Sequence, residues 1–261
     1  MIRIMTSNIW GDYYKNGVEI REDQLFETYR KYGCDIIGIQ EVTPSWHQSA
    51  LMRNMENAGY LILDDAPAPI NNYNVMLVRK DRFLVVKSGY APMPHTADVS
   101  KSMQWAVLEN RQTGKTIAVC TAHFEYRREP CHDVAREFEA EELVWRMQYL
   151  MRCHSCDAAF GMGDMNAGLS STIFDVYKKH GIQQLADLAP IHPTISTYHG
   201  YPVRGEDNRY HGTMTAYPYE RSLDHIIGTP GDYRVLNYQI VTDQPALDAT
   251  DHSPVFADLE F

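Results

Sequence analysis

The sequence predicts an α/β fold in which two packed sheets carry helices on their outer faces. Three observations indicate this fold. Strand-like runs alternate with helical segments in the first sixty residues, several strands follow one another from residue 75 onward, and a mixed pattern returns in the second half. Mixed strands with flanking helices are typical of layered sandwiches, because each apolar face must be covered by another element.

The first sixty residues read as strand, helix, strand and helix. Residues 2–9 alternate apolar and polar side chains, and residues 36–39 form a short apolar run, so both are predicted strands. Apolar residues at helical spacing predict a helix over residues 22–32. A second helix is predicted over residues 44–58, with Thr43 as its N-cap.

The rest of the chain contains mostly strands, interrupted by two helices. Consecutive strands are predicted at residues 75–78, 83–87, 103–109 and 116–122. Helices are predicted at residues 134–152 and 172–180. Later strands are predicted at residues 158–161, 222–227, 233–241 and 255–261.

Length and composition favour an ordinary globular protein. The 261 residues are 44% hydrophobic and 22% charged, which excludes disordered and low-complexity classes. We expect one domain over residues 1–261. No secretory leader or membrane span is visible, so we expect a cytoplasmic protein without membrane contact. Five cysteines, an odd number, favour free thiols over a disulfide framework.

The net charge of −10 bears on possible partners. Affinity for nucleic acid comes mainly from lysine and arginine, so an acidic protein is disfavoured as a binder of long duplexes. The basic pairs Arg127-Arg128 and Lys178-Lys179 could each hold a phosphate, although a solvated surface is the commoner role. The sequence does not indicate an oligomeric state.

Polar residues gather at the ends of the predicted strands, where a scaffold presents reactive groups. They are Asn8, Glu41, His123, Asp164, Asn166, Asp224, Asp251 and His252. Carboxylate and amide oxygens without nearby cysteine suit Mg²⁺ or Mn²⁺. A hard cation, carboxylates and histidines together provide what hydrolysis of a phosphoester requires.

The order of these motifs resembles the endonuclease/exonuclease/phosphatase family. It runs N, QE, TxH, GDxN, LDH and DHxP from residue 8 to residue 254, and GMGDMNA and TDHSP are the most specific pieces. The resemblance implies a four-layer αββα sandwich of two mixed, mainly antiparallel sheets. It also implies a Mg²⁺- or Mn²⁺-dependent phosphoesterase with its site at one end of the sheets.

The resemblance further implies roles for individual residues. Glu41 would be the main metal ligand and Asp251 a further ligand, while Asn8 would help to hold the metal or its ligand. Whether one or two metals bind is left open.

The catalytic roles also follow from the resemblance. Asp164 would position or deprotonate the attacking water, and Asn166 would orient the phosphate. His252 would bind non-bridging oxygens, with Asp224 fixing its tautomer. His123 would be a second phosphate contact or the acid near the leaving group.

The closer match is to small bacterial metal-dependent hydrolases, through residues 74–83 and 197–201. Relatives often carry an acidic residue where this chain has Asn71-Asn72, and an arginine where it has Lys101. Lys101, Arg127 and His199 are the candidate substrate contacts.

Residues 198–219 form a long predicted loop without clear periodicity, rich in tyrosine, histidine and charged residues. Such loops are often functional, so we expect it to wall the substrate pocket together with residues 125–131. His225 lies on the strand face opposite Asp224, which favours a packing role.

These observations favour hydrolysis of a small phosphoester, such as a nucleotide, a sugar phosphate or inositol phosphate, or a short phosphodiester. A DNA or RNA nuclease with the same chemistry is the alternative. A catalytically dead binding protein is disfavoured because Asp164 and His252 are both present. A serine hydrolase is disfavoured because the chain has no GxSxG elbow.

Overall fold

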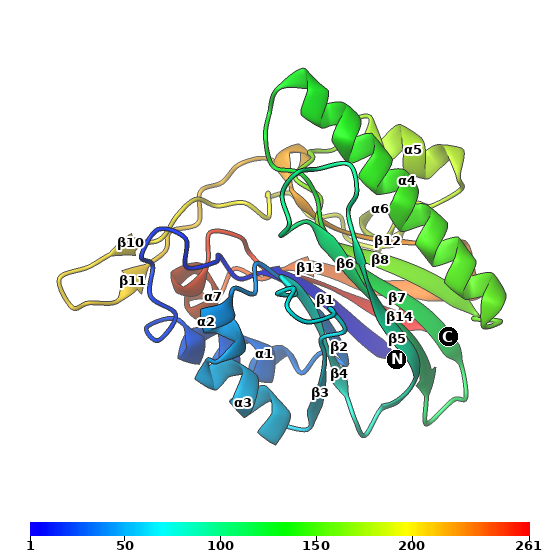
Figure 1. Cartoon of the computed structure of the whole chain (residues 1–261), viewed down its shortest axis with the longest axis horizontal. Coiled ribbons are helices and arrows are strands. Elements are labelled where there is room, and N and C mark those ends of the chain that lie inside the picture. The colour runs from blue at the N-terminus through cyan, green and yellow to red at the C-terminus, as the bar shows by residue number, and fades with distance from the viewer.

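The computed structural model describes residues 1–261 as two six-stranded sheets packed face to face, with helices on both outer faces (Figure 1). The predicted four-layer αββα sandwich is thereby confirmed. Both sheets are mixed, because each contains one parallel pair among antiparallel neighbours. The two termini lie at one end of the molecule, and a long hairpin projects at the other end (Figure 1).

The first sheet joins the two ends of the chain. Its strands, in spatial order, are β13 (Arg234–Ile240), β14 (Val255–Glu260), β1 (Ile2–Asn8), β2 (Ile36–Gln40), β4 (Asn74–Arg79) and β3 (Tyr60–Leu63). The parallel pair β1 and β2 sets Asn8 beside Gln40. Glu41, the next residue along the chain, therefore leaves the sheet beside Asn8.

The second sheet places three more polar residues at one edge. Its strands, in spatial order, are β5 (Phe83–Pro92), β6 (Ser102–Asn110), β7 (Thr116–His123), β8 (Ala158–Asp164), β12 (Asp224–Gly228) and β9 (Gln183–Gln184). The parallel pair β7 and β8 sets His123 opposite Asp164. The antiparallel pair β8 and β12 sets Asp224 opposite the same Asp164.

Helices cover the outer face of each sheet. Those on the first sheet are α1 (Glu22–Tyr32), α2 (Pro44–His47), α3 (Ala50–Asn57) and α7 (Gln244–Ala249). Those on the second sheet are α4 (Pro130–Cys153) and α5 (Ile173–Lys179). The remaining elements are α6 (Leu185–Leu188), the hairpin β10 (Val203–Arg204) and β11 (Tyr210–His211), and the 3₁₀ helix Tyr219–Arg221. None of the helices is both long and apolar enough to cross a membrane.

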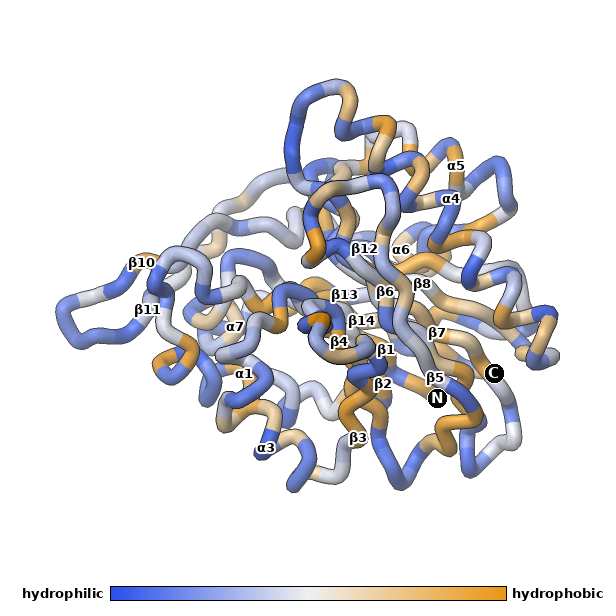
Figure 2. The backbone as a smooth tube through the Cα atoms, viewed as in Figure 1, coloured by the Kyte–Doolittle hydropathy of each residue, from blue (hydrophilic) through white to orange (hydrophobic).

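Three apolar layers hold the sandwich together. One fills the space between the sheets, and the other two lie between each sheet and its helices. The strands are mostly apolar along their length, whereas the tip of the projecting hairpin is hydrophilic (Figure 2). Burial of these layers is the main stabilising contribution to the fold, and it keeps the strand ends in a fixed register.

The structure differs from the sequence-based expectation in several elements. The helix expected over residues 44–58 is broken at Gln48-Ser49, where the Ser49 hydroxyl accepts a hydrogen bond from the Met52 backbone N–H and caps α3. Helix α4 begins four residues earlier than expected, with Pro130 in its first turn. Strand β3 (Tyr60–Leu63) was not predicted.

Candidate active site

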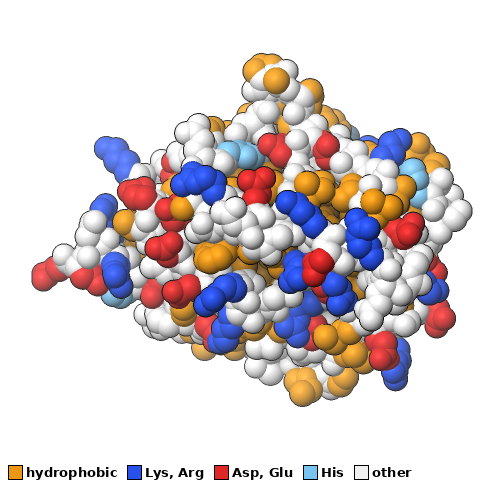
Figure 3. Space-filling view, turned by 90° about the horizontal axis from the view of Figure 1, so that it is seen from below, with side chains coloured by type: hydrophobic (Ala, Val, Ile, Leu, Met, Phe, Trp, Pro, Cys, Tyr) orange, Lys and Arg blue, Asp and Glu red, His pale blue; other side chains and the backbone are white.

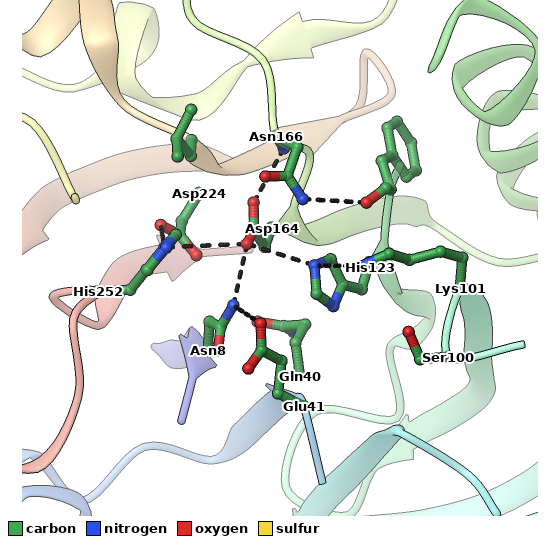
Figure 4. Close-up of polar contacts among 12 residues, drawn as sticks. Asn8, Gln40, Glu41, Ser100, Lys101, His123, Asp164, Asn166, Asp224 and His252 are labelled. Carbon is green, nitrogen blue, oxygen red and sulfur yellow. Dashed lines mark hydrogen bonds and ion pairs between the residues drawn. The ribbon is translucent and has the colours of Figure 1, made fainter. Parts of the chain in front are cut away.

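Side chains from five strand ends meet at one edge of the sandwich (Figure 4). Asn8 ends β1, His123 ends β7, Asp164 ends β8 and Asp224 begins β12. Glu41 follows β2 directly. The sequence-predicted residues are therefore brought together by the strand registers of both sheets.

The two sheets approach each other closely beneath this edge. A β-carbon added at Gly38 would lie 2.4 Å from the Thr121 hydroxyl oxygen on the opposite sheet. Gln40 crosses the same gap, since its Nε2 donates to Thr121 Oγ1 at 2.8 Å. This buried polar link fixes the end of β2 and therefore the start of Glu41.

Gly163 allows Asp164 to reach its position. Its φ is 150°, and a β-carbon there would lie 1.8 Å from the Ala122 carbonyl oxygen. Only glycine fits such a contact between neighbouring strand backbones. The close approach of β7 and β8 brings His123 Nε2 within 3.5 Å of Asp164 Oδ2.

Asn8 joins the carboxylates of the two sheets. Its Nδ2 donates to Glu41 Oε1 at 3.1 Å and to Asp164 Oδ2 at 2.9 Å. Its side-chain oxygen accepts from the Trp10 backbone N–H at 2.9 Å. Asn8 therefore presents its amide nitrogen to the carboxylates, an arrangement that orients them.

Glu41 is held in an uncommon backbone conformation. Its φ is +65°, in the left-handed region that non-glycine residues seldom adopt. Its Oε2 accepts from the Gly11 backbone N–H at 2.7 Å, so the carboxylate is fixed from two sides. Strain of this kind is typical of functional sites.

His252 and Asp224 form a buried ion pair. His252 Nδ1 lies 2.8 Å from Asp224 Oδ2. Burial alone would lower the pKa of His252, but the charges of Asp224, Asp251 and Asp164 outweigh it and raise that pKa well above its ordinary value. His252 is therefore a cation at neutral pH, with Nε2 left to contact a ligand.

For two of the buried carboxyl groups, nearby positive charge does not offset the effect of burial on the pKa. Burial raises the pKa of Asp164 to about 6, against the opposing charge of His252. Burial likewise raises the pKa of Asp251 to about 7, with the nearby Glu41 charge adding to the rise. The side chain of Asp251 has two weak contacts: the Thr250 hydroxyl at 3.5 Å, and His252 Nε2 at 4.0 Å from Asp251 Oδ2.

Lys101 reaches the site from the segment before β6. Its Nζ lies 2.8 Å from His123 Nε2, and both side chains are buried. Burial and then the Lys101 charge lower the pKa of His123 well below its ordinary value. The lysine thus carries the positive charge at this point, and the histidine accepts its hydrogen bond.

Asn166 stands beside Asp164 in a tight turn. Its backbone N–H donates to Asp164 Oδ1 at 2.9 Å, and its φ is +48°. Its Nδ2 donates to the Phe124 carbonyl oxygen at 3.0 Å. Asp164 therefore has both oxygens held, one by Asn166 and the other by Asn8.

A cavity of about 540 Å³ opens above these groups. Glu41, Lys101, His123, Asp164, Asn166, Asp251 and His252 form its floor. Around the floor stand six tyrosines, which we call the tyrosine collar: Tyr13, Tyr14, Tyr73, Tyr126, Tyr198 and Tyr201. Sequence reasoning missed Tyr13, Tyr14 and Tyr73, because they sit in loops without a motif.

Two of the expected substrate contacts, and most of the expected loop, do not line this cavity. Arg127 pairs with Glu125 at 3.1 Å, and its neighbour Arg128 lines the cavity instead. His199 is buried and does not line the cavity. Of the loop over residues 198–219, only Tyr198 and Tyr201 line it.

The rest of that loop does not wall the cavity, because the β10–β11 hairpin projects away from the body (Figure 1). His225 behaves as expected of a packing residue. Its Nε2 contacts the carbonyl oxygens of Ala167 and Ser222, and its ring packs edge-on against Phe174.

The donor set fits a hard divalent cation. Four carboxylates, those of Glu41, Asp164, Asp224 and Asp251, lie near two basic groups: His252, whose pKa is raised, and Lys101, whose pKa burial lowers from its ordinary value. Asp164, Asp224 and His252 also have donor atoms within 4.8 Å of one another, but the protonated His252 makes this group an ion-pair cluster and not a ligand set. Oxygen donors with excess negative charge, and raised carboxyl pKa values, suit Mg²⁺ or Mn²⁺.

Several solved structures share this architecture. Mannosyl-6-phosphatase of Bacteroides thetaiotaomicron is 20% identical, with 100% of each chain covered and a TM-score of 0.76. An endonuclease/exonuclease/phosphatase from Bacteroides vulgatus is 21% identical, with 99% of this chain and 98% of that chain covered and a TM-score of 0.77. D. rerio TDP2, complexed with a single-strand DNA product, is 14% identical, with 100% and 99% covered and a TM-score of 0.74.

At these identities the likeness concerns the fold. No curated protein sequence matches the chain. The sequence model described as Endonuclease/Exonuclease/phosphatase family matches residues 5–252, nearly the whole chain.

Proposed function

Because the chain belongs to the endonuclease/exonuclease/phosphatase family, we propose that it is a Mg²⁺- or Mn²⁺-dependent hydrolase of small phosphoesters. The observation that carries the proposal is the floor of the cavity. There, a protonated His252, a buried Lys101 and a doubly held Asp164 face one space. Positive groups of this kind can bind a phosphoryl group, and a fixed carboxylate can activate a water molecule.

Glu41 and Asp251 are the residues that would hold the cation. Both are cavity-lining carboxylates, and the contacts of Asp251 with Thr250 and His252 are long, at 3.5 and 4.0 Å. Asn8 orients Glu41 and Asp164 through its amide nitrogen. When bound, the cation would polarise the phosphoryl group and neutralise part of its charge.

Asp164 is the proposed base for the attacking water. Its two oxygens are fixed by Asn8 and by the Asn166 backbone, so the carboxylate cannot rotate freely. Its raised pKa of about 6 makes it a stronger proton acceptor than an exposed aspartate while it remains ionised at neutral pH. Asn166 therefore positions Asp164 through its backbone N–H. We propose that it also orients the phosphate, as the resemblance implies.

His252 and Lys101 supply positive charge to the phosphoryl oxygens. Asp224 holds the His252 ring through Nδ1, which directs the Nε2 proton toward the cavity. Lys101 donates to His123, so His123 is neutral and has a proton on Nδ1. Fixed donors of this kind stabilise the charge that develops in the transition state.

A small ester is favoured over a nucleic acid. The protein carries a net charge of −10, and Arg128 is the one arginine that lines the cavity. On the face seen in Figure 3, several lysines and arginines lie near the middle and acidic residues lie mostly toward the sides. Binding of a nucleic-acid strand draws on several cations along its path.

A panel of esters tests the proposal. Aryl phosphomonoesters, aryl phosphodiesters, nucleotides, sugar phosphates and a nicked plasmid are incubated with the protein and Mg²⁺ or Mn²⁺, with an EDTA control. Turnover of small esters alone supports the proposal. Cleavage of the plasmid would favour the nuclease, and absence of turnover on every substrate would favour a binding protein that kept the fold.

A further inference from the structure

The tyrosine collar leaves large aromatic surfaces exposed around the cavity. Tyr14 is 77% exposed and Tyr201 is 59% exposed, and Tyr13 and Tyr126 are also more than half exposed. These rings come from segments that are far apart in the sequence yet open onto one cavity. Exposed aromatic surface gathered around one cavity indicates a binding site, because covering it removes apolar area from water, which is favourable.

The collar is continuous with the catalytic floor. Tyr198 lies edge-on against His252, with ring centroids 5.3 Å apart. Trp10 also lines the cavity, and its ring centroid lies 5.5 Å from that of Tyr201. A substrate whose phosphoryl group reaches His252 therefore places its other end among these rings.

The few charged residues around the collar indicate that a neutral polar group binds there. Outside the floor, the charged residues lining the cavity are Asp98 and Arg128. One acid and one base do not form a track for further phosphates. The phenol hydroxyls and Asp98 instead offer hydrogen-bond partners to a neutral polar group.

The orientation of the rings favours a hydroxyl-rich ring over a flat base. Trp10 and Tyr201 are tilted by 38°, and Tyr198 and Tyr201 are nearly perpendicular at 87°. Neither pair leaves a parallel slot for a base; Tyr198 is nearly parallel to Tyr217, at 15°, but Tyr217 does not line the cavity. Tilted rings present both apolar faces and hydroxyl edges, which match the C–H faces and hydroxyl groups of a sugar.

We propose that the tyrosine collar binds the sugar ring of a singly phosphorylated sugar, whose phosphate is held on the catalytic floor. The inference rests on the proposed function, since it assigns the leaving group of the same reaction. The cavity volume of about 540 Å³ lies within the range usual for small-ligand sites.

The first test compares substrates. The wild-type protein with Mg²⁺ should hydrolyse glucose 6-phosphate with a kcat/KM about tenfold or more above those for glycerol 3-phosphate, which has no ring, and AMP, whose ribose carries a flat base that the collar does not fit. A preference for AMP would overturn the inference in favour of nucleotides. Equal values for glycerol 3-phosphate and glucose 6-phosphate would show that the collar is not used.

The second test uses Tyr14→Ala and Tyr201→Ala. Each should lower kcat/KM for glucose 6-phosphate about fivefold to twentyfold, mainly through KM. The inhibition constant of inorganic phosphate, which needs only the floor, should stay within about twofold of wild type. Tyr149→Ala is the matched control, because Tyr149 is 46% exposed on α4 and does not line the cavity.

Kinetics, and calorimetry where no ester is hydrolysed, distinguish an error in the collar inference from an error in the proposed function. If an aryl phosphate is hydrolysed but the tyrosine variants match wild type on glucose 6-phosphate, the collar inference is wrong and the function stands. If no ester is hydrolysed, the function fails, and glucose 6-phosphate is titrated into wild type with Mg²⁺. Binding that weakens in both tyrosine variants supports the collar, and absence of binding overturns it.

Discussion

Lys101 Nζ lies 2.8 Å from His123 Nε2, in a buried contact at the edge of the catalytic floor. Burial and the Lys101 charge lower the pKa of His123 well below its ordinary value, so the histidine is neutral and we assign the lysine as donor and the histidine as acceptor. The charge at this position therefore belongs to Lys101. Because an ammonium is a compact point charge, it can attract phosphoryl oxygens without the planar fork of an arginine.

Replacing Lys101 by methionine should lower kcat/KM for an aryl phosphate about 10²–10³-fold, because one fixed donor to the developing charge is lost. Methionine keeps an unbranched apolar stem of similar bulk, which limits the effect on packing. Lys115→Met is the control, since Lys115 is partly exposed and pairs with Asp157 away from the site. Activity of Lys101→Met close to that of Lys115→Met would remove Lys101 from the site.

Replacing Asp164 by asparagine should lower kcat about 10²–10⁴-fold, because the base that accepts the water proton is removed. The stability change should be small, about 1 kcal/mol, since shape is kept and the variant loses one acceptor toward Asn8 or Asn166. Thermal unfolding and steady-state kinetics are measured together. Asp175→Asn, an exposed position on α5, is the control. Near-wild-type turnover in Asp164→Asn would reassign the base.

Replacing Glu41 by glutamine should raise the Mg²⁺ concentration for half-maximal activity about tenfold or more, because a charged oxygen ligand becomes a neutral amide. Titration of Mg²⁺ into metal-free protein measures this concentration. The exposed Glu56→Gln serves as control. An unchanged requirement for Mg²⁺ would place the ligand elsewhere.

Replacing Glu139 by glutamine should stabilise the protein at alkaline pH. Glu139 is fully buried on α4, one carboxyl oxygen accepts from the Glu125 backbone N–H, and the other has no partner. Burial raises its pKa to about 7, so the native state binds a proton that the unfolded chain has already lost. The wild-type protein therefore loses stability as pH rises from about 4.5 to 7, by an amount on the order of 2–3 kcal/mol.

Glutamine stays neutral throughout this range. Denaturant unfolding at pH 5 should give similar free energies for Glu139→Gln and wild type, whereas at pH 8 the variant should be more stable by about 2–3 kcal/mol. Glu56→Gln, which is exposed, should show no such pH dependence. A variant that is less stable than wild type at pH 8 would contradict the raised pKa of Glu139.

Much of the fold could be predicted from hydrophobic periodicity. The runs ending at Asn8, Gln40 and His123 are strands, because their apolar side chains fill layers on one or both faces. Periodicity could not locate the break at Ser49, since a local cap competes there with continued helix. It also could not detect two-residue strands such as β9, which are defined by their partner strand.

The candidate site was predictable where polar residues follow strands. Asp164 and Asp224 belong to short motifs, and their pairing across β8 and β12 follows from the sheet. The contact between Lys101 and His123 was not predictable, because it depends on how the segment before β6 folds over β7. Tyr13 and Tyr14 were missed for the same reason, since a loop position carries no periodic signal.

The most direct test of the account is hydrolysis of an aryl phosphate by the wild-type protein, followed before and after EDTA and again after excess Mg²⁺. The expected result is turnover that EDTA abolishes and Mg²⁺ restores, with Asp164→Asn inactive under the restored condition. Turnover that persists at full rate in EDTA, or in Asp164→Asn, would contradict a metal-dependent hydrolase that uses this carboxylate as its base.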